Sequence, residues 1–135
     1  MRLTKARYKA LTGEEPPEDV GGERKYINEP TEAHGIRFDS KAEARRYEQL
    51  RLLEQAGAIT DLTVHPRYEL LPARTVDGKR KRARRYEGDF GYVEEGRQVV
   101  EDVKGAVTQV FSLKADLFRY RYPDIELRVI PAREV

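Results

Sequence analysis

The stretch RRYEGDFGYVEEGRQVVEDVKG, residues 84–105, decides the fold that we expect for this chain. It holds two runs rich in valine and aromatic residues, 84–93 and 97–104, and such runs are typical of β-strands. Between them the pair Glu95-Gly96 indicates a turn, since glycine supplies the unusual backbone angles that turns need. The stretch therefore predicts an antiparallel hairpin.

Working towards the N-terminus, SKAEARRYEQLRLLEQAG at 40–57 predicts a helix, with Ser40 as its N-cap and Gly57 as its end. The residues expected to share its apolar face are Ala42, Tyr47, Leu50, Leu53 and Ala56. Residues 58–72 become strand-like, with a break or edge at Pro66. The pair Asp77-Gly78 then predicts a second hairpin turn.

Towards the C-terminus, TQVFSLKADLFRYRYP at 108–123 predicts an amphipathic helix. The apolar residues that recur at helical spacing are Val110, Leu113, Leu117 and Tyr120, and Phe118, Tyr120 and Tyr122 are expected in a core or an interface. IELRVIP at 125–131 forms a last strand, which can pair in parallel after the helical crossover. The order of elements predicts an α/β fold with a mixed sheet flanked by helices.

Length and composition suggest one soluble domain. The chain has 135 residues, 37% of them charged, and its net charge is +2. Residues 1–35 include the proline- and glycine-rich run EEPPEDVGGE and are interpreted as an N-terminal extension or linker, which leaves 36–135 as the domain. Apolar runs are far too short for a membrane span, and no signal region is evident. We therefore expect a cytoplasmic protein without membrane contact.

The residue types limit the metals that the chain can bind. There is no cysteine, so disulfides and thiolate sites are excluded, and the two histidines, His34 and His65, are interpreted as structural or surface residues. Any metal would be held mainly by oxygen. This favours Mg²⁺ or Mn²⁺.

Asp102 and Lys104 are the first candidates for chemistry, because alternate residues of a strand share a face. A carboxylate can bind a cation there while the ammonium stabilises charge developing on a phosphate. The D-x-K pattern alone is common, and a salt bridge on the sheet is the plainer interpretation of it.

Asp89 strengthens the case, since a hairpin of this size can bring it beside Asp102. Facing carboxylates repel each other, and a divalent cation is the usual reason for such a pair. Gly88 and Gly91 flank Asp89 with little bulk, which allows close approach of a metal or a backbone. The alternative is that Asp89 is a solvated turn residue.

Glu43 is open to two interpretations. Ser40 and Glu43 fit a capping box, in which the glutamate folds back to the N-cap amide. In the functional interpretation, Glu43 projects from the first helical turn towards the carboxylates of the sheet.

A run of basic residues favours a nucleic-acid partner. The basic side chains of residues 79–85 repel one another unless an anion is near, because no acidic residue interrupts the run. The phosphate backbone of a nucleic acid is the natural anion. A solvated charged loop is the alternative. The candidate nucleic-acid-binding residues are Lys79, Arg80, Lys81, Arg82, Arg84 and Arg85, together with Lys114 on the second predicted helix.

Taken together, these motifs resemble the PD-(D/E)XK nuclease superfamily. The resemblance runs from about Lys25 to about Ile130 and rests on RFDSKAEARRYEQL, YEGDFGY, VVEDVKG and TQVFSLKADLF, which look like a phage-associated branch. It implies a restriction-endonuclease-like αβββαβ core. Gly88 stands where the motif's proline is expected, and that proline is often missing.

The resemblance also implies roles for the candidate residues. Asp89 and Asp102 would be metal ligands, Glu43 would complete the carboxylate set, and Lys104 would be the catalytic lysine of a Mg²⁺- or Mn²⁺-dependent DNA endonuclease. Small phage nucleases of this kind include homodimeric Holliday-junction resolvases, so branched DNA and a homodimer are the expected partners in phage recombination or replication.

Two other functions stay open. One is a non-catalytic nucleic-acid-binding protein, whose acidic residues serve only in salt bridges. The other is a nicking or repair nuclease with the same site but another substrate.

Overall fold

The computed structural model describes residues 30–135, and the expected linker within 1–29 lies outside these described residues. Two α-helices and a short 3₁₀ helix accompany the strands: α2 Lys41–Gln55, α3 Gln109–Arg121 and η2 Ala132–Glu134. The strands are β1 Thr31–Ala33, β2 Ile36–Phe38, β3 Thr60–Val64, β4 Arg67–Leu71, β5 Arg74–Val76, β6 Lys79–Lys81, β7 Arg84–Glu87, β8 Phe90–Glu94, β9 Arg97–Lys104 and β10 Glu126–Pro131.

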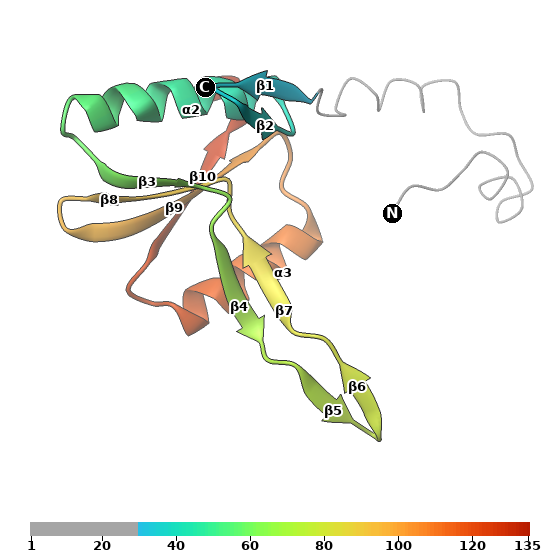
Figure 1. Ribbon diagram of the computed structural model, residues 1–135. Coiled ribbons are helices and arrows are strands. Elements are labelled where there is room, and N and C mark those ends of the chain that lie inside the picture. Colours follow the sequence, from blue (N-terminus) through green and yellow to red (C-terminus); the bar gives the residue numbers. More distant parts are fainter. Residues whose placement is uncertain (1–29) are drawn as a thin grey trace, which may run out of the picture.

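A mixed four-stranded sheet forms the centre of the molecule, in the order β10-β9-β8-β3 (Figure 1). Strands β3, β8 and β9 pair antiparallel, and β10 pairs with β9 in parallel after the crossover through α3. The expected α/β class with a mixed sheet and flanking helices is thus confirmed. The Glu95-Gly96 turn is confirmed as well, because both residues have positive φ, at 50° and 78°.

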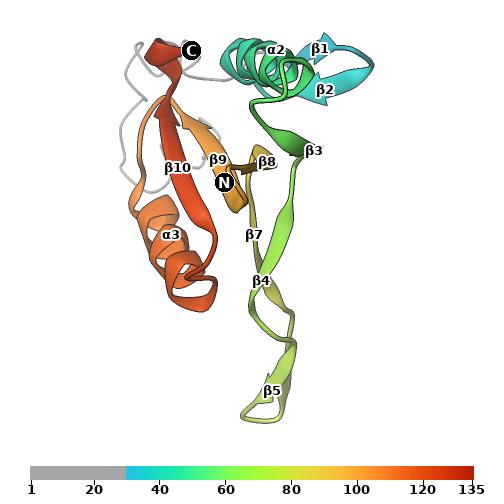
Figure 2. The ribbon, with the colours of Figure 1, turned by 90° about the vertical axis from the view of Figure 1, so that its left-hand side faces the viewer.

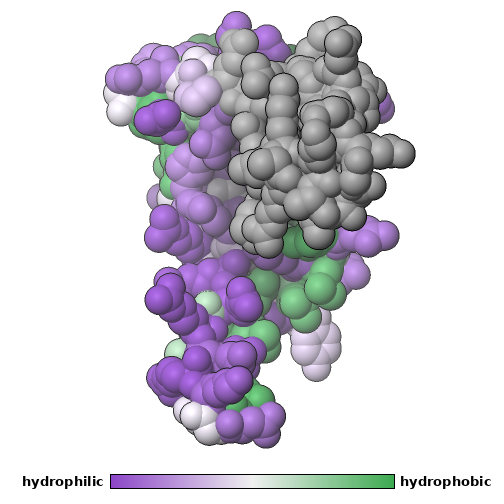
Figure 3. Space-filling view, turned by 90° about the vertical axis from the view of Figure 1, so that its right-hand side faces the viewer, coloured by the Kyte–Doolittle hydropathy of each residue, from purple (hydrophilic) through white to green (hydrophobic). Residues whose placement is uncertain are grey.

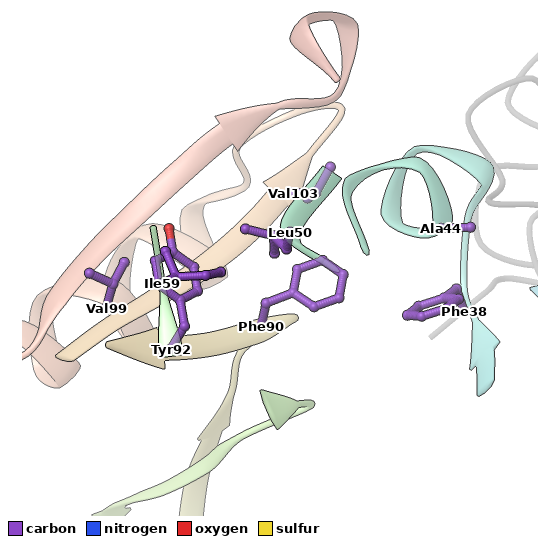
Figure 4. Packing of buried hydrophobic residues seen from close by; sticks show 8 residues of the cluster. All are labelled: Phe38, Ala44, Leu50, Ile59, Phe90, Tyr92, Val99 and Val103. Atoms are coloured by element: carbon purple, nitrogen blue, oxygen red, sulfur yellow. The ribbon is translucent and has the colours of Figure 1, made fainter. Parts of the chain in front are cut away.

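The two helices pack against opposite faces of this sheet. The side chains of α2 join a cluster that includes Val99 and Val103 of β9 (Figure 4), whereas those of α3 join a second cluster around Val100. Since alternate residues of a strand point to opposite faces, the two clusters lie on the two sides of β9. Asp102 shares a face with Val100, and Glu101 lies on the face of Val99, as the sequence predicts.

Helix α2 begins as predicted, but part of its expected apolar face is wrong. Ser40 is the N-cap, and its hydroxyl accepts a hydrogen bond from the Glu43 amide at 3.1 Å. Leu50 is buried, whereas Leu53 and Ala56 are exposed. The side chains that reach the core and the sheet, Ala44, Arg46 and Leu50, come from the earlier turns of the helix, and Leu53 and Ala56 follow them at its C-terminal end.

The run 84–93, expected as one strand, is broken at Gly88 and Asp89 into β7 and β8. Strand β7 leaves the central sheet and pairs with β4, and β5 pairs with β6 beyond them. These strands form a two-stranded extension, residues 67–87, that projects from the body (Figures 1 and 2). We call its outer part, residues 71–84, the arm. Asp77 and Gly78 have φ of 50° and 75°, so the predicted hairpin turn is confirmed at its tip.

Helix α3 is present, but it buries a different face from the expected one. The buried residues are Phe111, Ala115 and Phe118, while the side chains expected to share the apolar face are exposed, namely Val110, Leu113, Leu117 and Tyr120. The helix carries two adjacent apolar stripes, and the sheet takes the one whose aromatic rings contact Tyr68 and Tyr86. Phe118 is accordingly in the core, and Tyr122 packs against it.

The hairpin β1–β2 crosses the boundary that we place between residues 35 and 36. Its turn contains His34 and Gly35, and Ala33 packs against the core cluster beneath α2. Residues 31–35 therefore belong to the folded unit. Within residues 30–135, no helix is long and apolar enough to cross a membrane.

Candidate active site

Asp89 is fixed where three strands meet. Its backbone N–H donates to the Glu101 carbonyl and its own carbonyl accepts from His65, both at 2.9 Å. Its carboxylate Oδ2 accepts a hydrogen bond from the Val103 amide at 2.7 Å. The break between β7 and β8 therefore does not leave a loose turn, and the solvated-turn interpretation of Asp89 does not hold.

Gly88 and Gly91 are required for packing rather than for the approach of a metal. A Cβ at Gly88 would lie 2.5 Å from Cγ1 of Val100, and a Cβ at Gly91 would lie 3.3 Å from Cγ of Pro66. The close neighbours are thus side chains of this protein. Gly88 still serves the site, because its lack of a side chain lets the chain next to Asp89 lie close to Val100 of β9.

Asp102 and Lys104 lie on one face of β9, as predicted, and they form an ion pair. The Nζ of Lys104 is 3.2 Å from Oδ1 of Asp102. The other oxygen of Asp102 accepts a hydrogen bond of 2.6 Å from the buried hydroxyl of Tyr86. Burial and the nearby Asp102 raise the pKa of Tyr86 far above its usual value, so the phenol keeps its proton and remains a donor.

Glu43 combines features of both interpretations. The first half of the capping box is present, since the Ser40 hydroxyl accepts from the Glu43 amide. The carboxylate itself is buried, and its Oε2 has no hydrogen-bond partner within the described structure. Burial and the negative charge of Asp39 raise the pKa of Glu43, with a further contribution from Asp102.

A cavity of about 620 Å³ brings the four predicted catalytic residues together. Glu43 enters it from α2, Asp89 from the start of β8, and Asp102 and Lys104 from the end of β9. The sequence separates Glu43 from Lys104 by more than half of the described chain. Their meeting is the main feature that the fold adds.

Acidic side chains outnumber basic ones in this cavity, where Lys104 pairs with Asp102. Burial, together with the charges of Asp102 and Glu43, raises the pKa of Asp89 from 3.8 to about 8, against the hydrogen bond from Val103. A positive charge placed among the carboxylates would reverse this effect, because it favours their ionised forms.

The donor set fits a hard cation. Asp89, Asp102 and Glu43 supply only oxygen, and the unpartnered Oε2 of Glu43 is a buried acceptor that lacks a donor. As the side chains stand, no three acidic or histidine side chains of residues 30–135 are grouped closely enough to hold a metal together. Asp102 is engaged by Lys104 and Tyr86 instead.

A buried ion pair on the opposite face of β9 locks α2 to the sheet. Arg46 donates two hydrogen bonds to the fully buried Glu101, at 2.7 and 2.6 Å, and Tyr92 donates a third. Arg46 is one turn from Glu43, and Glu101 precedes Asp102. The pair therefore fixes the helix that carries one candidate ligand against the strand that carries another.

The predicted nucleic-acid-binding residues fall into two groups. Arg85 and Lys114 line a second cavity next to the acidic one. The others lie on the arm, exposed and away from both cavities: Lys79, Arg80, Lys81, Arg82 and Arg84. Figure 3 shows mainly hydrophilic surface over the projecting arm.

Comparison with known proteins places the chain in a family. Residues 23–133 match the family described as Protein of unknown function (DUF1064). The chain belongs to the DUF1064 family. No curated protein and no solved structure matches it. The match includes Glu43, Asp89, Asp102 and Lys104, so the whole cavity of this DUF1064 protein lies within the family region.

Sequence reasoning missed two residues of the DUF1064 site. Tyr86, which holds Asp102, stands in the quoted run YEGDFGY, but its pairing depends on how β7 leaves the sheet. His65, interpreted above as structural or surface, lines the acidic cavity at the end of β3. Its φ of 55° is unusual for a residue other than glycine. No local sequence pattern predicted that His65 would lie in the cavity. His34, in contrast, lies in an exposed turn beside Glu48 and Arg51.

Proposed function

We propose that this DUF1064 protein is a metal-dependent DNA endonuclease of the PD-(D/E)XK type. The observation that carries the proposal is the meeting of Glu43, Asp89, Asp102 and Lys104 in one cavity. The order of α2, the strands, α3 and β10 is compatible with the αβββαβ core that this assignment requires. The raised pKa of Asp89 supports it, since a cation explains why the acidic cluster is kept.

The proposed roles follow from the contacts of each residue. Asp89 and Asp102 would hold Mg²⁺ or Mn²⁺, with Glu43 completing the set through its unpartnered oxygen. When bound, such an ion would supply Lewis acidity and an activated water. Tyr86 keeps one oxygen of Asp102 oriented, and the Val103 amide does the same for Asp89. Lys104 stabilises negative charge that develops on the phosphate.

The proposed substrate is branched duplex DNA, as for a Holliday-junction resolvase acting in phage recombination or replication. The projecting arm supports contact with a duplex that extends beyond the cavity, because its exposed cations lie away from the carboxylates. The preference for branched DNA rests on the resemblance alone.

The decisive experiment is cleavage of labelled DNA in Mg²⁺, in Mn²⁺ and in EDTA. The substrates are linear duplex, single strand, flap, fork and four-way junction. We expect metal-dependent cutting by the wild type and by Asp116→Asn, which makes the same change at an exposed position of α3. Asp102→Asn should abolish cutting. Symmetric cuts in the junction alone would support a resolvase, whereas cutting by Asp102→Asn would show that the assigned site is wrong.

A non-catalytic nucleic-acid-binding protein is the second candidate function, and the Lys104–Asp102 ion pair of 3.2 Å favours it. In that case the carboxylate serves only to pair with the lysine. The same cleavage experiment separates the two functions. DNA binding without cutting in either metal would support the binding protein.

A further inference from the structure

Two cavities of opposite charge lie side by side at the end of β9. The acidic cavity described above is lined by five acidic residues and one lysine. The neighbouring cavity, of about 540 Å³, is lined by four basic and two acidic residues. Glu87, Asp102 and Lys104 belong to both linings, so the cavities share a wall. We call the second one the basic cleft.

The basic cleft is built from both sides of the fold. Arg67 comes from β4 and Arg85 from β7, while Lys114 lies opposite on α3. Neither Arg85 nor Lys114 forms an ion pair with any of the described residues. Arg67 has only a long contact with Glu87, at 3.5 Å, and both side chains are largely exposed.

Three cations from three elements therefore converge on one hollow, where only Arg67 has an acidic partner, Glu87. Such an arrangement repels itself, and an anion bound in the hollow relieves the repulsion. Arginine supplies planar, paired donors for phosphate oxygens, and lysine adds a compact charge. The apolar side chains of Val110 and Phe111 complete the lining. A cleft with a few directed cations and an apolar wall suits a phosphate that carries an organic group.

Lys104 stands at the border between the cavities. Its Nζ lies 3.2 Å from Oδ1 of Asp102 and 4.4 Å from the centre of the Phe111 ring. The Lys104 ammonium would therefore attract both a phosphodiester near the carboxylates and a second phosphodiester in the basic cleft. The shared wall makes the two linkages close neighbours.

We propose that the basic cleft is a phosphate-binding subsite that holds a phosphodiester of the same DNA strand, next to the linkage that is cut. The proposal rests on the proposed function. It assigns Arg67 to DNA binding and gives Arg85 and Lys114 a different task from that of the arm. The nuclease then needs at least one further charged linkage on one side of the scissile bond.

The first test uses the dinucleotide TpT, which has one phosphodiester, and its uncharged methylphosphonate analogue. Amide chemical shifts of the full chain are followed during titration in EDTA, so the result is independent of cleavage. We expect TpT to shift amides around Arg67, Arg85 and Thr108–Lys114, and the uncharged analogue to leave them in place. Arg85→Gln/Lys114→Gln should weaken TpT binding about tenfold or more.

The matched control is Arg45→Gln/Arg133→Gln, which removes the same charge from exposed positions outside the cleft. It should bind TpT as the wild type does. Equal weakening in both double variants, or shifts spread over the surface, would show general attraction to a basic protein and overturn the subsite.

The second test places one methylphosphonate at a known linkage of a DNA substrate and maps cutting in Mg²⁺. In the wild type, cutting should be suppressed at one particular bond, which lies a fixed number of nucleotides from the neutral linkage, because cutting there would place the neutral linkage in the basic cleft. In Arg85→Gln/Lys114→Gln this extra suppression should disappear. Cutting without a fixed offset would contradict the subsite alone, whereas TpT binding by a chain that cuts no DNA would contradict the nuclease.

Discussion

At the scale of single residues, Asp89 couples the fold to the proposed chemistry. Its backbone is bonded to two strands and its carboxylate to the Val103 amide. The carboxylate is thus held in place although burial and the nearby charges of Asp102 and Glu43 oppose its ionisation. At the position where a metal ligand is proposed, the fold thus holds a carboxyl group whose ionisation costs stability when no cation is bound.

This cost predicts how stability depends on pH without metal. The pKa of Asp89 is about 8 in the folded state and about 3.8 when unperturbed, so the folded protein retains a proton that the unfolded chain releases. Stability should therefore fall steadily as pH rises from about 4 to about 8. Above about pH 8 the folded carboxylate is ionised and this dependence ends.

Urea denaturation in EDTA, at about pH 5 and about pH 8, measures the effect. Asp89→Asn should be more stable than the wild type at the higher pH and should show a flatter profile. Mg²⁺ should stabilise the wild type at that pH and leave the variant unchanged. The same slope in both proteins would contradict the electrostatic role given to Asp89.

Glu43 offers a second prediction, because its two possible roles use different atoms. The cap depends on the backbone amide of Glu43 and the hydroxyl of Ser40, whereas metal binding depends on the carboxylate. Glu43→Gln should keep stability at or above the wild-type value and weaken Mn²⁺ binding measured by calorimetry. Ser40→Ala should lower stability by about 1 kcal/mol.

The contrast between these two variants decides between the interpretations. If Glu43→Gln leaves Mn²⁺ binding intact while Ser40→Ala lowers stability, the cap explains the residue and its proposed metal role is wrong.

At the scale of elements, the arm is distinct from the site. In the β5–β6 register Arg74 pairs with Lys81 and Val76 with Lys79, so three cations share one face of the ribbon. Thr75 and Arg80 lie on the other face. A ribbon with one strongly cationic face is suited to lie along the phosphates of a duplex.

Neutralising this face predicts a change in salt dependence rather than in cutting chemistry. With Arg74, Lys79 and Lys81 replaced by glutamine, the slope of log affinity against log salt should fall by about 0.9 for each phosphate that the arm no longer neutralises. Fluorescence anisotropy with a linear duplex in EDTA measures it. An unchanged slope would show that the arm neutralises no phosphate and is only a solvated loop. Arg45→Gln/Arg133→Gln, which removes charge from exposed positions outside the arm, should leave the slope close to that of the wild type.

At the scale of the whole molecule, the exposed stripe of α3 bears on the expected homodimer. The spacing of Val110, Leu113, Leu117 and Tyr120 alternates between three and four residues, as in helices that pack against another helix. Leu113 is 61% exposed and Tyr120 is 88% exposed. Figure 3 shows hydrophobic surface next to the hydrophilic arm.

We therefore predict that a homodimer, if the protein forms one as the resemblance implies, uses this stripe. Sedimentation equilibrium should give a dimer for the wild type and a monomer for Leu113→Glu, because a buried unpaired carboxylate opposes association. Ser112→Glu adds the same charge at an exposed neighbour outside the stripe and should remain dimeric. A wild type that is monomeric at all concentrations would contradict the prediction.

The sequence by itself determined the two helices, the two hairpin turns and the alternation along β9, but not the break between β7 and β8 or the β1–β2 hairpin. Ser40, Asp77-Gly78, Glu95-Gly96 and the period-2 pattern of VVEDVKG act through the local backbone, so their structures follow from near neighbours. The candidate set Glu43, Asp89, Asp102 and Lys104 was also named from sequence, and the fold gathers it in one cavity.

Only the tertiary structure decided which faces the helices bury and how the site is held. Helix α3 carries two apolar stripes, and contact with Tyr68 and Tyr86 selects the one with Phe111 and Phe118, which helical spacing alone cannot do. The hydrogen bond from Tyr86 to Asp102, the place of His65 and the basic cleft likewise join residues distant in sequence. Such contacts depend on how strands and helices pack in space, and a local pattern carries no information about that packing.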